Sequence, residues 1–302
     1  MRIVFMGTPE FAVPSLKGLL AAGHEVVGVY TNPDRPKNRG MKMLPSPVKA
    51  AALEAGLPVF QPKSLREEGV LENLTELAPE LIVVAAYGQI LPKTILELPR
   101  YGCINVHSSL LPKYRGAAPI NWAVVNGEKE TGVTIMYMAQ GLDTGDIITQ
   151  RATPIGAEED AEILYTRLAA LGGALLTETL DQIAAGTAQR TPQDDAQHSY
   201  APMLSRALSP IDWNRSAQAI HDQIRGLVPW PATTFELEGK TFKAFSSRVG
   251  NSTEKEPGTL IGGDNDGIKF ACGDGKELCL TDIQAPGKRR MKASDYLRGH
   301  KL

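Results

Sequence analysis

The sequence is poor in the residues and motifs that mark several common classes of protein. Its three cysteines, Cys103, Cys272 and Cys279, are too few and too far apart for a disulfide framework, and none belongs to a zinc-binding Cys-x-x-Cys pair. We expect them to be small buried apolar side chains, and we expect no metal. The phosphate-binding motifs G-x-G-x-x-G and G-x-x-x-x-G-K-[ST] are absent, which argues against a dinucleotide site and against nucleotide hydrolysis.

A long apolar run and a strong net charge are also lacking. No stretch approaches the ~18 consecutive apolar residues of a membrane span. The opening MRIVFMGTPEF contains no small-residue cleavage site, so we expect a cytoplasmic protein without a signal peptide. Lys and Arg number 32 against 34 Asp and Glu, a net charge of −2 over 302 residues, and 42% of the residues are hydrophobic. This length and composition predict two domains, each with a core of its own.

The charge is divided unevenly along the chain. Residues 1–205 carry 17 basic and 22 acidic side chains, whereas residues 206–302 carry 15 and 12. A basic cluster close to the C-terminus faces a single acid, Asp295, and consists of Lys288, Arg289, Arg290, Lys292, Arg298 and Lys301. Such a cluster is commonly a solvated surface, and it is also compatible with contacts to nucleic-acid phosphates.

Strand and helix patterns alternate through the first two thirds of the chain. Residues 2–6, 25–30 and 81–86 are short apolar or β-branched runs typical of buried strands, while residues 47–55 and 161–183 have helical spacing. Near-continuous apolar strands separated by helices predict an α/β domain with a mostly parallel sheet. In such domains ligands bind beyond the carboxyl ends of the strands.

The composition turns polar after Gly186, in the stretch TAQRTPQDDAQHSYAP. We therefore predict a first domain at residues 1–190, a linker at 191–205 and a second domain at 206–302. Within the second domain, TTFEL and TFKAF flank Glu-Gly-Lys as in a β-hairpin, and further short strands follow. Several short strands in so few residues predict a small β-barrel.

Three polar residues could form a reactive site at the edge of the predicted sheet. Asn105 and His107 lie two apart on an apolar strand, so both project from one face near its carboxyl end. Asp143, in a loop bracketed by glycines, could reach back to His107. A carboxylate fixes the tautomer of an imidazole, and an amide can donate to a developing oxyanion. With G-x-S-x-G absent, these groups suit direct attack by a substrate nucleophile. Alternatively, Asn105 and Asp143 only tie down loops.

Several longer motifs carry a resemblance to a known family. These are the segments Asn105-Val-His107, SLLPKYRG at 109–116 and DTGD at 143–146, together with FMGTPEFA at 5–12, PDRPKNRG…PSPVK at 33–49, AAYGQILP at 85–92 and PGKRRMKASDYLRG at 286–299. The sequence resembles, along nearly its whole length, the formyltransferases that use 10-formyltetrahydrofolate.

The resemblance implies an α/β fold with a Rossmann-like catalytic domain and a second, smaller β-barrel domain of the oligonucleotide-binding (OB) type. It implies transfer of a formyl group from 10-formyltetrahydrofolate to the α-amino group of methionine esterified to initiator tRNA. Asn105, His107 and Asp143 would form the catalytic triad. The cofactor-binding residues would be Tyr87, Gly88, Gln89, Ile90, Leu91, Ser109, Leu110, Leu111 and Pro112.

The same resemblance gives the basic segments a role in binding tRNA. The loop from Asn32 to Leu44 would contact the acceptor stem, with Arg39 aimed at the acceptor end, although without the resemblance it would be interpreted as a solvated loop. The second domain would contact phosphates, and we expect a monomer. The predicted tRNA-binding residues are Arg35, Lys37, Arg39, Lys42, Lys288, Arg289 and Arg290.

Three rival functions are weighed against this one. A formyltransferase acting on an aminosugar nucleotide shares the three catalytic residues and a similar second domain, so it is the nearest alternative. One acting on glycinamide ribonucleotide would leave residues 206–302 without a role. A tRNA-binding protein without catalysis would have no reason to bring Asn105, His107 and Asp143 together.

Overall fold

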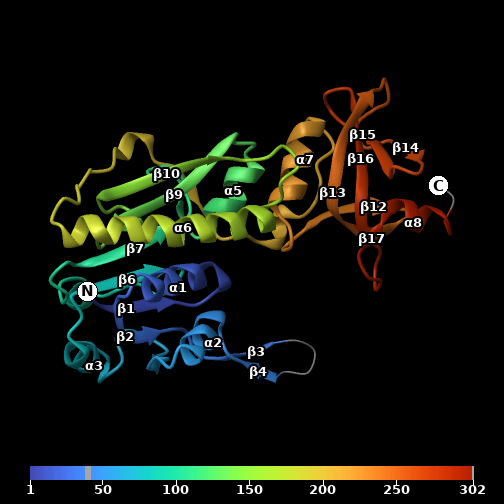
Figure 1. Cartoon of the computed structure of the whole chain (residues 1–302). Helices are drawn as coiled ribbons and strands as arrows, with labels where there is room; N and C mark the ends of the chain where they lie inside the picture. Colours follow the sequence, from blue (N-terminus) through green and yellow to red (C-terminus); the bar gives the residue numbers. More distant parts are fainter. Residues whose placement is uncertain (38–41, 301–302) are drawn as a thin grey trace. The chain divides into compact units, whose positions relative to one another are not determined.

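The computed structural model describes residues 1–37 and 42–300 (Figure 1). Contacts divide the chain into two units, each drawn from three separate stretches. The first unit comprises Met1–Gly116, Thr131–Thr153 and Tyr165–Tyr200, and the second comprises Ala117–Glu130, Pro154–Leu164 and Ala201–Leu302. The boundaries at 190 and 206 stay a prediction, but the polar stretch 191–200 packs within the first unit.

A seven-stranded sheet forms the centre of the first unit (Figure 1). Five strands are joined by parallel pairings, and β9 joins β7 antiparallel. Along the sheet the strands are β10 (Ile147–Pro154), β9 (Glu130–Tyr137), β7 (Cys103–His107), β6 (Leu81–Ala85), β1 (Arg2–Gly7), β2 (Glu25–Tyr30) and β5 (Val59–Phe60). The predicted mostly parallel α/β sheet is confirmed.

The buried strands are the apolar runs seen in the sequence. Ile3 to Met6 of β1 are fully buried, because parallel strands are covered on both faces. The covering elements are η1 (Glu10–Ala12), α1 (Val13–Ala21), α2 (Pro47–Glu54), α3 (Val70–Leu77), α4 (Lys93–Leu96) and α6 (Ala161–Ala184). A Cβ on Gly173 of α6 would lie 2.9 Å from the backbone of Pro14, so glycine lets α6 approach α1 closely.

The predicted basic loop contains a short hairpin. Strand β3 (Arg35–Lys37) pairs antiparallel with β4 (Lys42–Leu44), with Lys37 opposite Lys42. Asp34, at its base, accepts hydrogen bonds from Lys49 at 2.6 Å and from Gln61 at 2.8 Å. These two side chains, Lys49 foremost, hold the pKa of Asp34 below its usual range. The chain is thus anchored where the hairpin begins.

An antiparallel sheet forms the core of the second unit, as the predicted small β domain requires. Its strands are β12 (Thr233–Leu237), β13 (Lys240–Ser252), β16 (Lys276–Gln284), β15 (Ile268–Ala271) and β14 (Leu260–Gly263), with β17 (Met291–Lys292) paired to β16. The predicted hairpin between β12 and β13 is confirmed, with Phe235 opposite Phe242. The helices of this unit are α5 (Pro119–Val125), α7 (Ala217–Gly226) and α8 (Ala293–Leu297).

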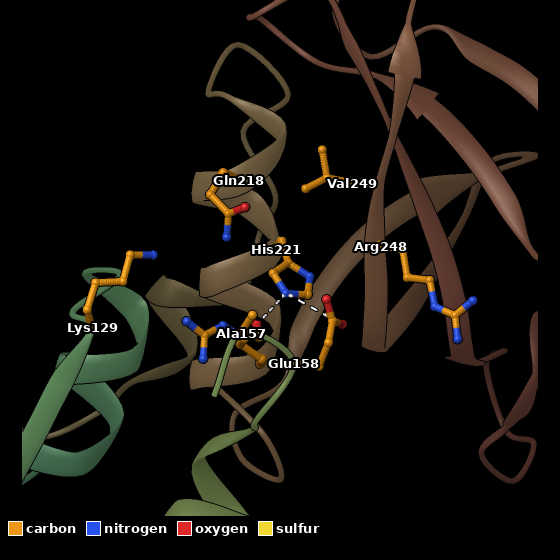
Figure 2. Close-up of a pocket in the computed structure, with 8 residues that line it drawn as sticks. Lys129, Ala157, Glu158, Gln218, His221, Arg248 and Val249 are labelled. Atoms are coloured by element: carbon orange, nitrogen blue, oxygen red, sulfur yellow. Dashed lines mark hydrogen bonds and ion pairs between the residues drawn. The ribbon is translucent and has the colours of Figure 1, made fainter. Parts of the chain in front are cut away.

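Helix α7 also borders a cavity of about 290 Å³ in the second unit (Figure 2). His221 is buried there: its Nε2 donates to the Ala157 carbonyl at 3.2 Å, and Ser247 Oγ lies 3.0 Å from Nδ1. Figure 2 shows Lys129 and Arg248 on opposite sides of this histidine. Because both ring nitrogens of His221 are satisfied within the fold, its role is structural.

The cysteines agree with the expectation from composition. Cys103, Cys272 and Cys279 are all buried free thiols, and burial raises the pKa of Cys103 and Cys272 to about 12 and of Cys279 to about 11. At neutral pH they are protonated apolar side chains rather than nucleophiles. Among the described helices, none has the length and apolar character needed to cross a bilayer.

Candidate active site

His107 ends β7 and is held from both sides of its ring. Its Nε2 lies 2.9 Å from the Tyr114 carbonyl, which can only accept, so Nε2 carries the proton. Its Nδ1 faces Asp143 Oδ2 at 3.7 Å, with the two side chains 6% and 14% exposed. The neutral ring turns a lone pair toward the carboxylate, whereas the protonated ring forms an ion pair with it. Each ring nitrogen of His107 therefore faces an acceptor, and the orientation of the ring is fixed.

Asp143 takes an unusual backbone conformation to reach this histidine. Its φ is 52°, in the left-handed region that side chains other than glycine seldom adopt. The Gly116 N–H donates to Asp143 Oδ2 at 2.9 Å. The loop after β9 is thus bound to the loop after β7, and the structure brings Asp143 and His107 together.

Asn105 stands two residues before His107 on β7, on the same face of the sheet. It pairs with Val84 of β6 on one side and with Met136 of β9 on the other. The side chain is half-buried, and its amide has no hydrogen-bond partner in the described part of the chain. Two amide N–H groups therefore remain for a ligand beside the His107–Asp143 pair.

The loop that follows β7 is fixed to the sheet by polar contacts. Ser109 is fully buried: its hydroxyl donates to the Lys113 carbonyl at 2.6 Å, and its own carbonyl accepts from Thr134 Oγ1 at 2.7 Å. Gln150 Nε2 donates to the Leu111 carbonyl at 2.8 Å, while the Leu111 N–H donates to Thr134 Oγ1 at 3.1 Å. The carbonyls of Ser109 and Leu111 thus hold the loop in shape.

Within this loop, Leu110 and Pro112 are half-buried. Ser109 and Leu111 are buried against the protein. Of the folate-binding residues predicted in this loop, Leu110 and Pro112 are therefore the two whose side chains a ligand can reach. Their cofactor-binding role stays a prediction.

The other predicted folate loop follows β6, the parallel neighbour of β7, so both loops leave the same edge of the sheet. Tyr87 and Leu91 are buried in the core, Gly88 is exposed with a φ of 83°, and Ile90 is 81% exposed. Burial raises the pKa of Tyr87, whose buried hydroxyl has no partner among the described residues. Gln89 donates to the Asn32 side chain at 2.9 Å. An exposed apolar side chain beside the exposed Gly88 suits the apolar slot and polar edge that a pterin needs.

The predicted tRNA-binding cations differ in their surroundings. Arg39 lies outside the described residues, whereas Arg35 and Lys37 lie on β3 and Lys42 on β4. Arg290 already has partners within the protein: it pairs with Asp282 at 3.3 Å, and its guanidinium lies over the Phe245 ring.

Two cations near the C-terminus remain available. Lys288 and Arg289 are exposed in the turn between β16 and β17, without an ion pair in the described part of the chain. Within the described part of the predicted cluster these two cations have no acidic partner, while Arg290 and Lys292 share the single carboxylate of Asp282. In residues 1–37 and 42–300, no group of three or more His, Cys, Asp or Glu side chains is placed to hold a metal ion.

Two supporting residues were missed by sequence reasoning. The Tyr114 carbonyl is a backbone group, which no side-chain pattern reveals. Gln193 donates to the carbonyls of Asp143 and Gly145, both at 2.8 Å, but it lies 50 residues from Asp143 in a stretch whose polarity predicts a linker. Gln193 is half-buried between exposed neighbours, which only the structure shows, so no local sequence signal marks it.

The comparison with known proteins assigns the family. A family model described as formyl transferase matches residues 1–180, and one described as formyl transferase, C-terminal domain, matches residues 203–301. The chain belongs to the formyl transferase family. Its relatives include the methionyl-tRNA formyltransferase of Citrifermentans bemidjiense, 52% identical over 302 residues that span 100% of this chain and 94% of that protein.

A second relative and a solved structure extend the comparison. The methionyl-tRNA formyltransferase of Geotalea uraniireducens is 50% identical over 303 residues, covering 100% of this chain and 96% of its own. The structure of WlaRD, a sugar 3N-formyl transferase in the presence of dTDP and 5-N-formyl-THF, superposes with a TM-score of 0.70 at 21% identity. It covers 96% of this chain and 99% of its own, and it confirms the predicted fold class of a Rossmann-like domain with a smaller OB-like one.

Proposed function

We propose that this protein transfers the formyl group of 10-formyltetrahydrofolate to the α-amino group of methionyl-initiator tRNA, giving N-formylmethionyl-tRNA for translation initiation. The observation that carries the proposal is the 52% identity to a methionyl-tRNA formyltransferase, which extends over both units of the chain. The likeness to a sugar formyl transferase is one of fold, at 21% identity. The alternative function, formylation of an aminosugar nucleotide, is therefore included in the assay below as a competing reaction.

The three polar residues suit a direct transfer between the two substrates. The neutral amine attacks the formyl carbon and a tetrahedral oxyanion forms. The Asn105 amide, which no described group occupies, donates to this oxyanion, and the charge of protonated His107 lowers its energy. The attacking amine loses a proton and the departing folate nitrogen gains one, which restores neutrality as the carbon–nitrogen bond breaks.

Asp143 acts on this reaction through His107. It lies 3.7 Å from Nδ1, and together with the Tyr114 carbonyl on Nε2 it fixes the ring plane and the tautomer. A water bridging Asp143 and the reacting amine would complete the proton path. The role of Asn105, His107 and Asp143 as the catalytic triad is part of this proposal.

Folate recognition is assigned to the two loops at the shared edge of β6 and β7. A pterin presents alternating donors and acceptors on one edge of a flat ring, which backbone groups can match inside an apolar slot. Ile90, Leu110 and Pro112 supply accessible apolar surface, while Tyr87 and Gln89 shape the loop from within. These residues would hold the folate and leave its formyl carbon to Asn105 and His107.

The remaining parts of the proposal concern the tRNA. The β3–β4 hairpin with Arg35, Lys37, Arg39 and Lys42 would contact the acceptor stem, and Lys288 and Arg289 of the second unit would contact phosphates. Arg290 would add to them only by releasing Asp282. We further propose that the protein acts as a monomer in the cytoplasm, where charged initiator tRNA is found.

One assay tests the proposal directly. The protein is incubated with 10-formyltetrahydrofolate and either methionyl-initiator tRNA or an aminosugar nucleotide, and the formylated amine is identified by mass. We expect formylmethionyl-tRNA and no formylated sugar. Formylation of the sugar alone would refute the proposal, and uncharged tRNA serves as the control for the requirement of a free α-amino group.

A further inference from the structure

Residues 191–199, called the strap below, run along the two loops that hold His107 and Asp143. At its start Thr191 and Ile147 exchange backbone hydrogen bonds of 2.8 and 2.9 Å. Within the strap every residue is exposed except two, Gln193 and Ser199, which are half-buried. Their side chains contact the active-site loops, as does that of the exposed Asp195.

Gln193 holds the Asp143 loop through both hydrogens of its amide. Nε2 donates to the carbonyls of Asp143 and Gly145, each at 2.8 Å. Oε1 accepts from Arg115 Nε at 3.0 Å. The orientation of the amide is determined by these partners, because the reverse would set an oxygen against two carbonyls and an NH₂ group against a guanidinium.

Arg115 and Ser199 extend the same network to the other side of the imidazole. Arg115 is buried, and besides Gln193 it binds Asp195 of the strap at 2.7 Å. Ser199 Oγ accepts from the Tyr114 N–H at 2.8 Å, and its carbonyl accepts from the Arg115 N–H at 2.9 Å. Tyr114 supplies the carbonyl that binds His107 Nε2, at a φ of 60°. Both residues that face the imidazole therefore occupy left-handed conformations secured by the strap.

We propose that Gln193 is a positioning residue for formyl transfer: it keeps the backbone of the Asp143 loop in the conformation that points the carboxylate at His107 Nδ1. The left-handed backbone of Asp143 is costly for a residue with a side chain, and two hydrogen bonds from one amide offset that cost. This inference rests on the proposed function, since it assigns Gln193 to the reaction that Asp143 serves.

The isosteric variant Gln193→Glu is the sharpest test. A carboxylate of the same shape keeps its contact with Arg115 but has no proton for the two carbonyls, so it repels them. A displacement of the catalytic group by about 1 Å costs on the order of 100-fold in rate, and we expect kcat to fall by that factor. The KM values for folate and tRNA should change by less than about threefold, since the Gln193 amide is occupied by groups of the protein.

Two further variants separate positioning from folding. Gln197→Glu makes the same chemical change in the strap, at an exposed side chain that donates to Asp194 and to no other described side chain, and should leave kcat unchanged. Adding Gln193→Glu to Asp143→Asn should lower kcat by no more than about threefold further, because residues acting through one group are not additive. Thermal unfolding is followed for each variant.

Three outcomes would overturn the inference. They are a parental kcat for a folded Gln193→Glu protein, a loss confined to KM, or a full additional loss in the Asp143→Asn background. If Gln193→Glu does not fold, Gln193→Asn, too short to reach both carbonyls, replaces it, and failure of both to fold would make Gln193 structural. An inactive parent protein would instead refute the proposed function, which keeps the two failures distinct.

Discussion

Replacing Asp143 with Asn removes a charge from the active site while keeping the shape of the side chain. The Asn oxygen can still accept the Gly116 N–H, so the loop should stay in place. The variant therefore isolates the electrostatic contribution of the carboxylate to formyl transfer. We expect a large loss of kcat with little change in the affinity for either substrate.

The size of the loss can be worked out from the geometry. Unit charges 3.7 Å apart, both largely buried, attract by about 4.5 kcal/mol at an effective dielectric constant of about 20. If losing the carboxylate removes this attraction from the transition state and not from the ground state, the rate falls by a factor on the order of 1,000. The Gly116 N–H already offsets part of the carboxylate charge, so a fall of about 100- to 1,000-fold is expected.

Single-turnover formylation of methionyl-tRNA with saturating enzyme measures the chemical step without product release. Binding of uncharged tRNA and the thermal midpoint of unfolding serve as controls. A rate within about tenfold of the parent would limit the contribution to about 1.4 kcal/mol and would refute the assignment of Asp143 as the partner of a charged His107.

Three further variants test the remaining assignments. His107→Ala should abolish formylation and leave tRNA affinity near that of the parent, whereas retained turnover would refute a catalytic role. Arg35→Ala with Arg39→Ala should slow transfer at subsaturating charged tRNA, and an unchanged rate there would exclude the hairpin from acceptor binding. Lys288→Ala with Arg289→Ala should reduce the salt-dependence slope of tRNA binding by about 1 for each phosphate that the variant no longer neutralises, so an unaltered slope would show that this turn does not touch the backbone.

The parts of the fold that local patterns encode were predicted closely. Glu25–Tyr30 forms β2 as predicted, and the helical spacing at 161–183 corresponds to α6, Ala161–Ala184. The position of Asn105 and His107 on one face of a strand followed from the period of two, which holds for any strand. A short apolar run predicts a buried strand from its own composition, without any knowledge of the residues that it contacts in the fold.

The parts that depend on distant partners were not predictable. The strap has the composition of a linker, and only the positions of Asp143 and Tyr114 in space explain why Gln193 and Ser199 are half-buried. The pairing of Arg290 with Asp282 is likewise invisible in the sequence, because it requires the register between β16 and β17. Cations counted along the chain therefore overstate the charge that a ligand meets.

The alternation of the chain between its two units has a consequence for recombination. Residues 117–130 and 154–164 belong to the second unit although they precede most of it, and α5 packs against α7 there. A crossover that exchanged only residues 201–302 between related genes would pair α5 of one parent with α7 of the other. Chimaeras of this family should then succeed according to how well these two helices match, rather than according to where the join is made.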